Sequence, residues 1–438
     1  MADISPFSGL RYAADRVGDL ASVLCPPYDV ISDDERGQLE ARHPENVVRL
    51  ELPRGADDTR YATAARLLAS WTAEGILRPD ARESFYVYEQ QFGYAGQRYT
   101  RRGFFAAVRL EAFERRVVLP HEKTLSAPKE DRRRLLRATR TQISPVFGLY
   151  RDASGAARAI IDEAASAAPA VDATTSDGVR HRLWPITSAA ALDGLRLLLA
   201  DKQILIADGH HRYETMLGLA PEMRPLDVAA GAAASDFAMM FLARAEDPGL
   251  LVLPTHRMVN DLPDFSFDGL CAALAAAFDI SQGDETTAAA IEARLARDGA
   301  KRVVFAVRAP GRPFTVWLAL KPILDLSALG PPTLRNLDVT VLHGVILGPL
   351  LAIDAEALAK QSFLTYTHDT AEALARVDKG EVQAAFFMNA TKVEQVLAAC
   401  EAGSVLPQKS TYFLPKLATG LLMYRLDGPA PRPGPVTR

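Results

Sequence analysis

The sequence has few cysteines, no long apolar run and no surplus of positive charge. Its three cysteines, Cys25, Cys271 and Cys400, are far apart in a chain of 438 residues. This spacing predicts neither a disulfide framework nor a zinc site, and it is typical of a reducing cytoplasm. The N-terminal stretch MADISPFSGLRYAADRV lacks the apolar core of a signal peptide, and no run approaches the length of a membrane span. We therefore expect a cytoplasmic protein with no membrane partner.

The charge balance and two missing motifs narrow the range of functions. Lys and Arg number 50 against 54 Asp and Glu, which gives a formal net charge of -4. A general nucleic-acid binder needs a basic surface, and no convincing helix-turn-helix module is visible, so we expect no nucleic-acid partner. A local basic pocket remains compatible with this balance. The chain also has no G-x-x-x-x-G-K-[ST] box and no protein-kinase signature, which excludes an ordinary P-loop or protein-kinase site.

The length and the hydrophobic pattern predict a mixed α/β (α+β) protein with more than one domain. A chain of this length is expected to form two to three domains. We expect an N-terminal α/β region over residues 1–260, a more regular α/β region over 261–426 and a disordered Pro/Gly-rich tail over 427–438. The segments FAMMFLARA and LLVLPTHRMV are predicted to be adjacent strands, joined by a hairpin turn at Asp247-Pro248-Gly249.

The stretch from Lys202 to Met216, KQILIADGHHRYETM, is the strongest candidate for a functional site. It predicts a buried strand over Gln203–Ala207, a turn, and then a helix, as the end of a βαβ-like unit. A helix N-terminus offers unpaired N–H groups and partial positive charge, which suit a phosphate. The side chains at this turn are candidate acid/base, phosphate-binding or metal-binding groups: Asp208, His210, His211 and Arg212. The alternative is that Asp208 only caps the helix and that the histidines are surface or core residues.

Two N-terminal segments supply further candidates. The prolines of CPPYDVIS fix an extended turn that presents Tyr28 and Asp29 in a set direction, although a rigid turn packed on the body is an alternative. The segment NVVRLEL, residues 46–52, alternates like a half-buried strand, with Arg49 and Glu51 on one face. This face is either solvated or the lining of a pocket.

Polar clusters also precede a basic helix and follow a late proline. The H-E-K-T cluster is not a zincin box, because no second histidine follows one turn later. It lies before a helix beginning near Pro128, whose arginine-rich face is either simply solvated or able to hold a polyanionic substrate. The C-terminal lysines and serine could clamp a phosphate or carboxylate, or form a structural loop. The candidates in these two segments are His121, Glu122, Lys123, Thr124, Lys409, Ser410 and Lys416.

The motifs CPPYDVIS, HPENVVRLELP, HEKT, ADGHHRYET, LPTHR and PQKSTYFLPKLATGL occur in this order between about Phe7 and Leu426. In this order they resemble the prokaryotic domain-of-unknown-function 1015 (DUF1015) family. The most specific of them are ADGHHRYET and PPYDVI. The resemblance implies family membership rather than an activity, with serine biosynthesis as a pointer.

The D-G-H-H-R box is also similar to that of free-serine kinases of the ParB/sulfiredoxin-like superfamily. The resemblance implies a strand-turn-helix that places phosphate groups at the helix start. Asp208 would then be a base or a Mg2+ ligand, while His210, His211 and Arg212 would hold the phosphates. Sulfiredoxins have a cysteine in the corresponding G-C-H-R turn, where His210 stands here, so cysteine-sulfinate repair is not expected.

Three functions remain in competition. The first is a phosphotransferase acting on a small hydroxylated metabolite such as free serine, with a nucleotide or pyrophosphate donor and Mg2+. The second is a phosphatase or other hydrolase of a small phosphorylated metabolite, and the third is a nucleotide-responsive binding protein. For the enzyme, we assign catalytic roles to Asp208, His210 and Glu122, and substrate or phosphate binding to the remaining candidates.

Overall fold

The computed structural model describes residues 2–55, 58–122, 126–226, 228, 233–360, 362–428 and 431. The chain forms two compact units. The first contains Met1–Pro120, Thr124–Leu251 and Pro415–Arg438, and the second contains His121–Lys123 and Val252–Leu414. In the described residues no helix is long and apolar enough to cross a membrane.

The units differ from the predicted division at the C-terminal end. Pro415 to Leu426, expected in the C-terminal region, belongs to the first unit. Long-range hydrogen bonds cause this assignment: buried Arg101 donates to the Pro415 carbonyl at 2.5 Å, and Tyr424 pairs with Gln142 in a short antiparallel ladder. Most of the predicted tail, 427–438, lies outside the described residues.

A mixed sheet forms the centre of the first unit. Within the described residues its order is β6-β11-β8-β12-β5-β4-β10-β9, and β1 also pairs with β5. The β11–β6 and β12–β8 pairs are parallel and the others antiparallel. The strands are β1 (Ile4–Ser5), β4 (Phe85–Tyr94), β5 (Gln97–Arg109), β6 (Val118–Leu119), β8 (Val146–Tyr150), β9 (Val171–Thr174), β10 (Arg180–Ile186), β11 (Ile204–Asp208) and β12 (Phe237–Arg244).

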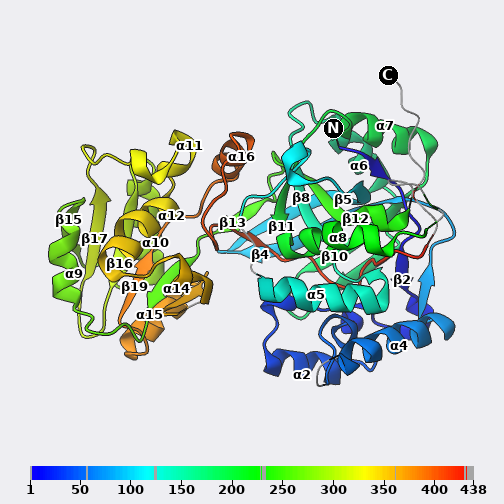
Figure 1. Cartoon of the computed structure of the whole chain (residues 1–438), viewed down its shortest axis with the longest axis horizontal. Coiled ribbons are helices and arrows are strands. Elements are labelled where there is room, and N and C mark those ends of the chain that lie inside the picture. Colours follow the sequence, from blue (N-terminus) through cyan, green and yellow to red (C-terminus); the bar gives the residue numbers. More distant parts are fainter. Residues whose placement is uncertain are drawn as a thin grey trace. The chain divides into compact units, whose positions relative to one another are not determined.

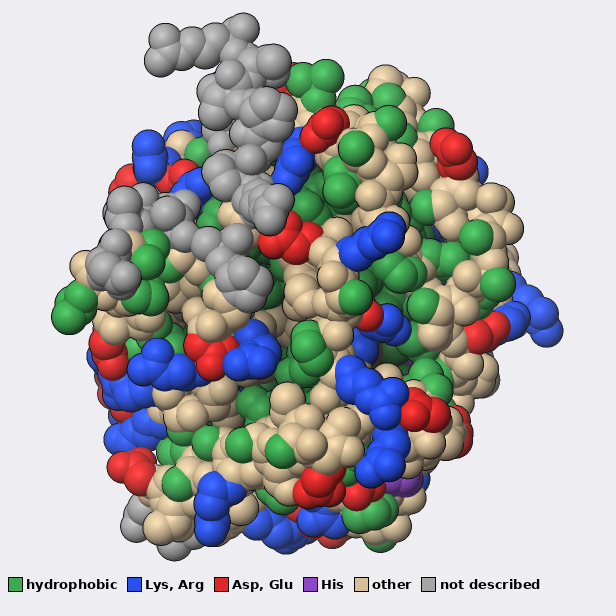
Figure 2. Space-filling model, turned by 90° about the vertical axis from the view of Figure 1, so that its right-hand side faces the viewer, with side chains coloured by type: hydrophobic (Ala, Val, Ile, Leu, Met, Phe, Trp, Pro, Cys, Tyr) green, Lys and Arg blue, Asp and Glu red, His purple; other side chains and the backbone are tan. Residues whose placement is uncertain are grey.

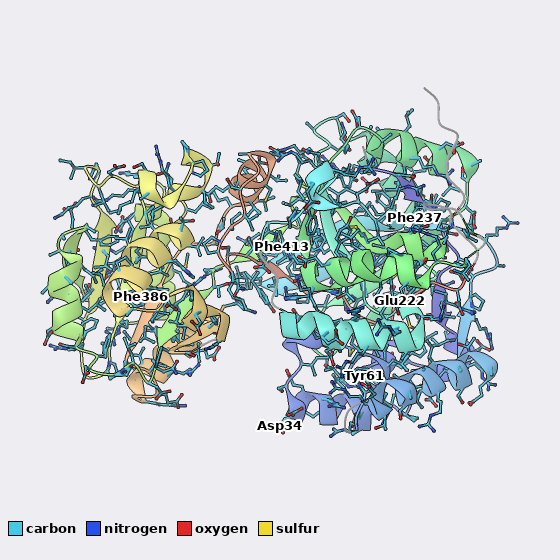
Figure 3. All side chains as sticks on the ribbon, in the orientation of Figure 1. Asp34, Tyr61, Glu222, Phe237, Phe386 and Phe413 are labelled. Carbon is cyan, nitrogen blue, oxygen red and sulfur yellow. The ribbon has the colours of Figure 1, made fainter. Side chains whose placement is uncertain are left out.

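Helices and short ladders complete the first unit. Figure 1 shows α4, α5 and α8 side by side, with α8 next to the sheet. Tyr61 lies between α4 and α5, where its hydroxyl donates to Asp131 at 2.7 Å (Figure 3). The elements are α1 (Ala14–Val17), α2 (Asp33–Arg42), α3 (Val48–Glu51), α4 (Thr59–Ala73), α5 (Ser126–Thr139), α6 (Ala156–Ala164), α7 (Ala189–Leu199), α8 (His210–Met223), and the strands β2 (Leu10–Tyr12), β3 (Leu77–Pro79), β7 (Thr141–Gln142) and β21 (Tyr424–Arg425).

The predicted strand before the site is confirmed, but its neighbours differ from a simple βαβ unit. The chain runs from β10 through α7 to β11, as expected. In the sheet, however, β8, β12, β5 and β4 separate β10 from β11. β11 instead lies between β6 and β8, so its polar end depends on strands distant in sequence.

The segment 46–52 is not the predicted strand. It contains the short helix α3, Val48–Glu51. Asn46 explains the difference, because its side chain accepts from the Val48 N–H at 3.0 Å and donates to the carbonyls of Ser22 and Leu24 at 2.7 and 3.1 Å. This local side-chain bond turns the backbone where the apolar alternation indicated an extended chain.

The second unit has its own antiparallel sheet. Its order is β15-β17-β16-β19-β14-β18 in the part of the chain that is described, and helices α10 and α15 contribute Ile291, Leu295, Leu374 and Val377 to its core. The strands are β14 (His256–Val259), β15 (Phe278–Gly283), β16 (Val304–Arg308), β17 (Thr315–Leu320), β18 (Leu364–Thr367) and β19 (Ala384–Phe387). The helices are α9 (Phe267–Leu274), α10 (Ala288–Gly299), α11 (Pro332–Arg335), α12 (Asp338–Val341), α13 (Gly348–Leu351), α14 (Ala355–Lys360), α15 (Thr370–Asp378) and α16 (Val393–Glu401), with a π-helix at Leu342–Leu347 and short strands β13 (Leu251–Leu253) and β20 (Tyr412–Leu414).

The predicted hairpin through Asp247-Pro248-Gly249 is wrong. β12 belongs to the sheet of the first unit, whereas β14 pairs with β18 and β19 in the second. Gly249 lies close to the backbone of β5, since a Cβ there would lie 2.2 Å from the Thr100 carbonyl oxygen. The turn therefore packs against β5 and leads out of the first sheet.

Charges of both signs are mixed on the surface of the first unit. On the face that Figure 2 shows, Lys and Arg side chains are interspersed with Asp and Glu. The described part of this face therefore shows no surface patch of one charge sign.

Candidate functional site

A strand, a glycine and a helix create the centre of the site in the first unit. β11 ends at Asp208, Gly209 follows with φ +91°, and α8 begins at His210. Only glycine adopts this backbone conformation easily. A Cβ on Gly209 would also lie 3.0 Å from Cζ of Arg212. The glycine therefore provides the turn and the space in which the Arg212 guanidinium folds back toward Asp208.

The Asp208 carboxylate is held by two cations. Its Oδ2 accepts from Arg212 Nη2 at 2.6 Å and its Oδ1 accepts from Lys416 Nζ at 2.6 Å. Gly209, not Asp208, occupies the N-cap position, and no side chain caps there. The interpretation of Asp208 as a simple helix cap is therefore wrong, and its ion pairs assign it to a charged cluster.

The same ion pairs decide the protonation of Asp208. Burial would raise the pKa of its carboxyl, but the charges of Lys416 and Arg212 hold that pKa well below its usual range. A carboxylate with a low pKa keeps its charge and is a weak base. The geometry thus favours Asp208 as a group that positions the two cations.

Arg212 connects the D-G-H-H-R turn to the P-P-Y-D segment. It is 8% exposed and also donates to the Pro145 carbonyl. Burial lowers its pKa, but Asp208, Asp29 and Tyr28 outweigh that effect and raise it. Tyr28 begins a short 3-10 helix, Tyr28–Val30, and Asp29 is exposed. Two motifs separated by about 180 residues of sequence therefore act on one guanidinium, a juxtaposition that no local pattern contains.

Sequence reasoning missed a buried pair beside Arg212. Glu51 is 1% exposed and accepts from Ser144 Oγ at 2.9 Å, while Arg132, 6% exposed, donates to the Glu51 carbonyl at 2.9 Å. The Arg132 guanidinium also lies 4.1 Å from the Tyr28 ring centroid. Burial and the Asp29 charge raise the pKa of Tyr28 to about 12, so this phenol stays neutral. Arg132 belongs to the run Arg132-Arg133-Arg134, which the sequence predicted to be either solvated or able to hold a polyanionic substrate; Arg132 is instead buried.

The remaining predicted residues of the first unit have smaller roles in this cluster. Buried His210 begins α8 and, after Lys416 and Arg212, also lowers the pKa of Asp208, while half-buried His211 follows it. Arg49 lies on α3 and donates to the Glu40 carbonyl at 2.9 Å. Arg49 thus contacts α2, not the Asp208 cluster, through that bond.

A cavity of about 220 Å³ adjoins Lys416. Lys416 lines this cavity and also donates to Asp208, so it connects the cavity with the charged cluster. Four charged side chains line it: Glu35, Arg42, Asp177 and Lys416. The rest of its wall is formed by Leu24, Cys25, Pro26, Ile31, Gln38, Leu39, Thr175, Ser176, His181, Leu417 and Ala418. Of these residues only Lys416 was a candidate site residue, although Cys25, Pro26, Ile31, Leu417 and Ala418 lie within the quoted motifs.

Other candidates gather within the second unit. Buried His121 bonds through Nε2 with Thr411 Oγ1 at 2.8 Å, and Glu122 Oε2 accepts from the Lys409 N–H at 3.3 Å. Ser410 is buried, and its hydroxyl donates to the Pro407 carbonyl at 2.5 Å. The H-E-K-T and Q-K-S-T segments thus meet, as polar groups that also hold a loop. Lys123 and Thr124 lie outside the described residues.

The predicted magnesium ligand has a different set of partners here. Both Asp208 oxygens accept from cations. The described residues also contain no group of three or more His, Cys, Asp and Glu side chains arranged to hold a metal ion. Asp208 is therefore engaged by Arg212 and Lys416 at the place where the sequence predicted a Mg2+ ligand.

Comparison with known proteins gives a family and several distant structural similarities. A search of curated proteins yields no significant match. A conserved hypothetical protein from Pyrococcus furiosus has 15% identity, a TM-score of 0.35, and coverage of 69% of this chain and 89% of that one. A free serine kinase in complex with AMP has 14% identity, a TM-score of 0.36, and coverage of 68% and 84%. SbnI with a C-terminal truncation, from Staphylococcus aureus, has 9% identity, a TM-score of 0.34, and coverage of 73% and 86%.

The family match is more extensive than the predicted site. It covers residues 4–340 and so includes the P-P-Y-D, H-E-K-T and D-G-H-H-R motifs. The expectation from the motif order is confirmed: the chain belongs to the DUF1015 family, described as a protein of unknown function.

Proposed function

We propose that this protein is a small-molecule phosphotransferase that moves a phosphoryl group from a nucleotide or pyrophosphate to the hydroxyl of a small metabolite. Free serine is the first acceptor to test, because of the similarity of the D-G-H-H-R box. One observation carries the proposal. Lys416 contacts Asp208 beside the N-terminus of α8 and also lines the 220 Å³ cavity. A phosphate at the helix start and an acceptor in the cavity would then share one cation.

The charges suit phosphoryl transfer better than covalent catalysis. Such a reaction depends mainly on positioning and on neutralising charge as it develops on the phosphoryl oxygens. Arg212 and Lys416 bring two positive charges to the N-terminus of a 14-residue helix, against the single charge of Asp208. The N–H groups of a helix start add partial positive charge. The cluster thus offers two cations and the helix N–H groups to an anion.

Each residue of the cluster has a distinct role in this proposal. Arg212 and Lys416 bind phosphoryl oxygens, and Asp208 positions both of them. Half-buried His211 contributes to the polar surface at the helix start, whereas buried His210 acts electrostatically on Asp208. Mg2+ would enter with the phosphate donor and neutralise its charge, a role that remains a proposal.

The size of the cavity supports an acceptor rather than a donor site. Pockets for drug-sized ligands measure roughly 300–1,000 Å³, whereas this cavity measures about 220 Å³. A small metabolite matches this volume better than a whole nucleotide does. The donor would therefore extend from the α8 start outside the cavity.

Turnover assays separate the three candidate functions. The protein is incubated with L-serine, with Mg2+ present or absent, and with ATP, ADP or pyrophosphate in turn, and phosphoserine is measured by mass spectrometry. Phosphoserine formation supports the transferase. In a parallel incubation with phosphoserine as the substrate, release of phosphate without transfer indicates the hydrolase. Thermal stabilisation by a nucleotide without turnover indicates a binding protein.

A matched pair of lysine variants tests the site itself. Lys416→Gln removes the shared cation, and we expect a loss of about 10²-fold or more in kcat/KM. Lys202→Gln is the control, since Lys202 pairs with Asp201 and does not line the cavity. Equal activity in Lys416→Gln and Lys202→Gln would contradict the assigned site.

A further inference from the structure

Two of the four charged side chains of the 220 Å³ cavity are already engaged by the fold. Glu35 Oε2 accepts from the Ser32 N–H and hydroxyl at 2.8 and 2.9 Å, in a capping box that begins α2. Lys416 is ion-paired with Asp208. These two groups therefore have structural partners, and Arg42 and Asp177 are the other two charged side chains of the cavity.

Arg42 and Asp177 have no ion-pair partner among the described residues. Arg42, at the end of α2, is exposed, and within the described part of the chain it donates only to Ser176 Oγ, at 3.1 Å. Asp177 is exposed and uses only Oδ1, which accepts from Thr175 Oγ1 at 2.6 Å and from the Val179 N–H at 3.2 Å. The two opposite charges flank Ser176 on one cavity wall without pairing with each other. A ligand with separated charges of both signs would satisfy both.

A chain of hydrogen bonds holds the wall that carries Asp177. Tyr88 Oη bonds with His181 Nδ1 at 2.7 Å, His181 Nε2 with Thr175 Oγ1 at 2.9 Å, and Thr175 with Asp177. The single Thr175 proton goes to Asp177 at 2.6 Å or to the Val179 carbonyl at 3.1 Å, and both of these oxygens only accept, so His181 Nε2–H donates to Thr175 and the Tyr88 hydroxyl donates to Nδ1. Burial lowers the pKa of His181 to about 4, so the ring is neutral and this pattern persists near pH 7. The Thr175–Asp177 turn is thus preorganised.

We propose that this cavity binds a free amino acid or a similar small zwitterion, with Arg42 binding its carboxylate and Asp177 binding its ammonium group. Arginine binds a carboxylate in a fork geometry, and a carboxylate oxygen accepts well from an ammonium group. The apolar side chains Leu24, Ile31, Leu39 and Leu417 would contact the carbon skeleton. This inference rests on the proposed function only in naming the zwitterion as the phosphoryl acceptor.

Binding without any phosphate donor tests the proposal. Isothermal titration calorimetry compares a panel of zwitterions (L-serine, L-threonine and L-homoserine) with two truncated probes. Ethanolamine retains the ammonium group but has no carboxylate, and glycerate retains a carboxylate but has no ammonium group. We expect at least one zwitterion to bind about tenfold or more tightly than either probe. A panel in which no zwitterion binds more tightly than the probes overturns the proposal.

Two variants test which side chain binds the carboxylate of the ligand and which binds its ammonium group. Arg42→Gln should reduce the preference for serine over ethanolamine by about tenfold and leave the preference over glycerate unchanged. Asp177→Asn should reduce the preference for serine over glycerate by about tenfold and leave the preference over ethanolamine unchanged. The side chains of Arg42 and Asp177 are exposed, so we expect the fold to tolerate both substitutions. Arg66→Gln and Asp201→Asn are the matched controls, because both residues are exposed and lie outside the cavity. Preferences that do not change in either variant overturn the assignment.

The outcomes of the two proposals are distinguishable. Zwitterion binding that is lost in Arg42→Gln or Asp177→Asn, with no phosphoserine formed by the wild type, refutes the transferase and supports the binding site. Phosphoserine formation with an unchanged KM for serine in both variants supports the transferase and overturns the binding site.

Discussion

Replacement of Asp208 by Asn tests the reasoning about the charged cluster most directly. The amide keeps the shape of the side chain but removes the negative charge that lies between Arg212 and Lys416. Removing one partner of a buried ion pair costs about 3–5 kcal/mol, because a buried charge is left without compensation. The side chain of Asp208 is 17% exposed and that of Arg212 is 9% exposed, so solvent screens part of this cost. We expect a loss of about 2–4 kcal/mol in the free energy of unfolding of the first unit.

Tryptophan fluorescence can measure this loss in the first unit alone. Trp71 and Trp184 lie in the first unit and Trp317 in the second. Urea unfolding is therefore followed in a Trp317→Phe background, with Asp201→Asn as a matched control at an exposed acidic residue. A midpoint for Asp208→Asn equal to that of Asp201→Asn would refute the ion-pair reasoning.

The pH dependence supplies a second check on Asp208. Its folded-state pKa lies below the ordinary value, so its contribution to stability is present above the unfolded-state pKa of about 4 and is lost as the pH falls toward the folded-state value. The difference between wild type and Asp208→Asn should therefore be full at pH 7 and shrink below about pH 4. A difference that stays constant into acid would contradict the assigned ionisation.

Three further predictions concern individual residues. Gly209→Ala forces a side chain into a backbone with φ +91° and against Arg212, so we expect a loss of about 1–3 kcal/mol in the same urea assay; no loss would contradict the close approach. Arg212→Lys cannot hold Asp208 and the Pro145 carbonyl together, and calorimetry with ATP or pyrophosphate should show at least about tenfold weaker binding; unchanged affinity removes Arg212 from the phosphate site. Burial raises the pKa of Asp338 to about 7, above its unfolded value, so its contribution to the stability of the second unit is full below about pH 4 and is lost as the pH rises through 7. Unfolding followed by Trp317 fluorescence should therefore show higher stability at pH 5 than at pH 8, and Asp338→Asn should flatten this dependence.

Local chemistry determined the elements on which the site is built. The apolar run before Asp208 predicted β11, and the Asp-Gly turn predicted the start of α8 at His210. Ser32 caps α2 in a capping box with Glu35, which is a local signal of the same kind. These predictions held because each depends on neighbours within a few residues in the chain.

Tertiary structure decided which groups these elements bring together. Lys416 reaches Asp208 across 208 residues of sequence, and this pairing follows from the return of the C-terminal segment to the first unit. Arg132 is buried beside Glu51 although its neighbours Arg133 and Arg134 are exposed, because only one face of α5 meets the rest of the unit. Charge runs and alternating patterns reflect only the local preference of a segment for a secondary structure or for solvent. The partner of a buried charge depends on the packing of segments that are distant in sequence.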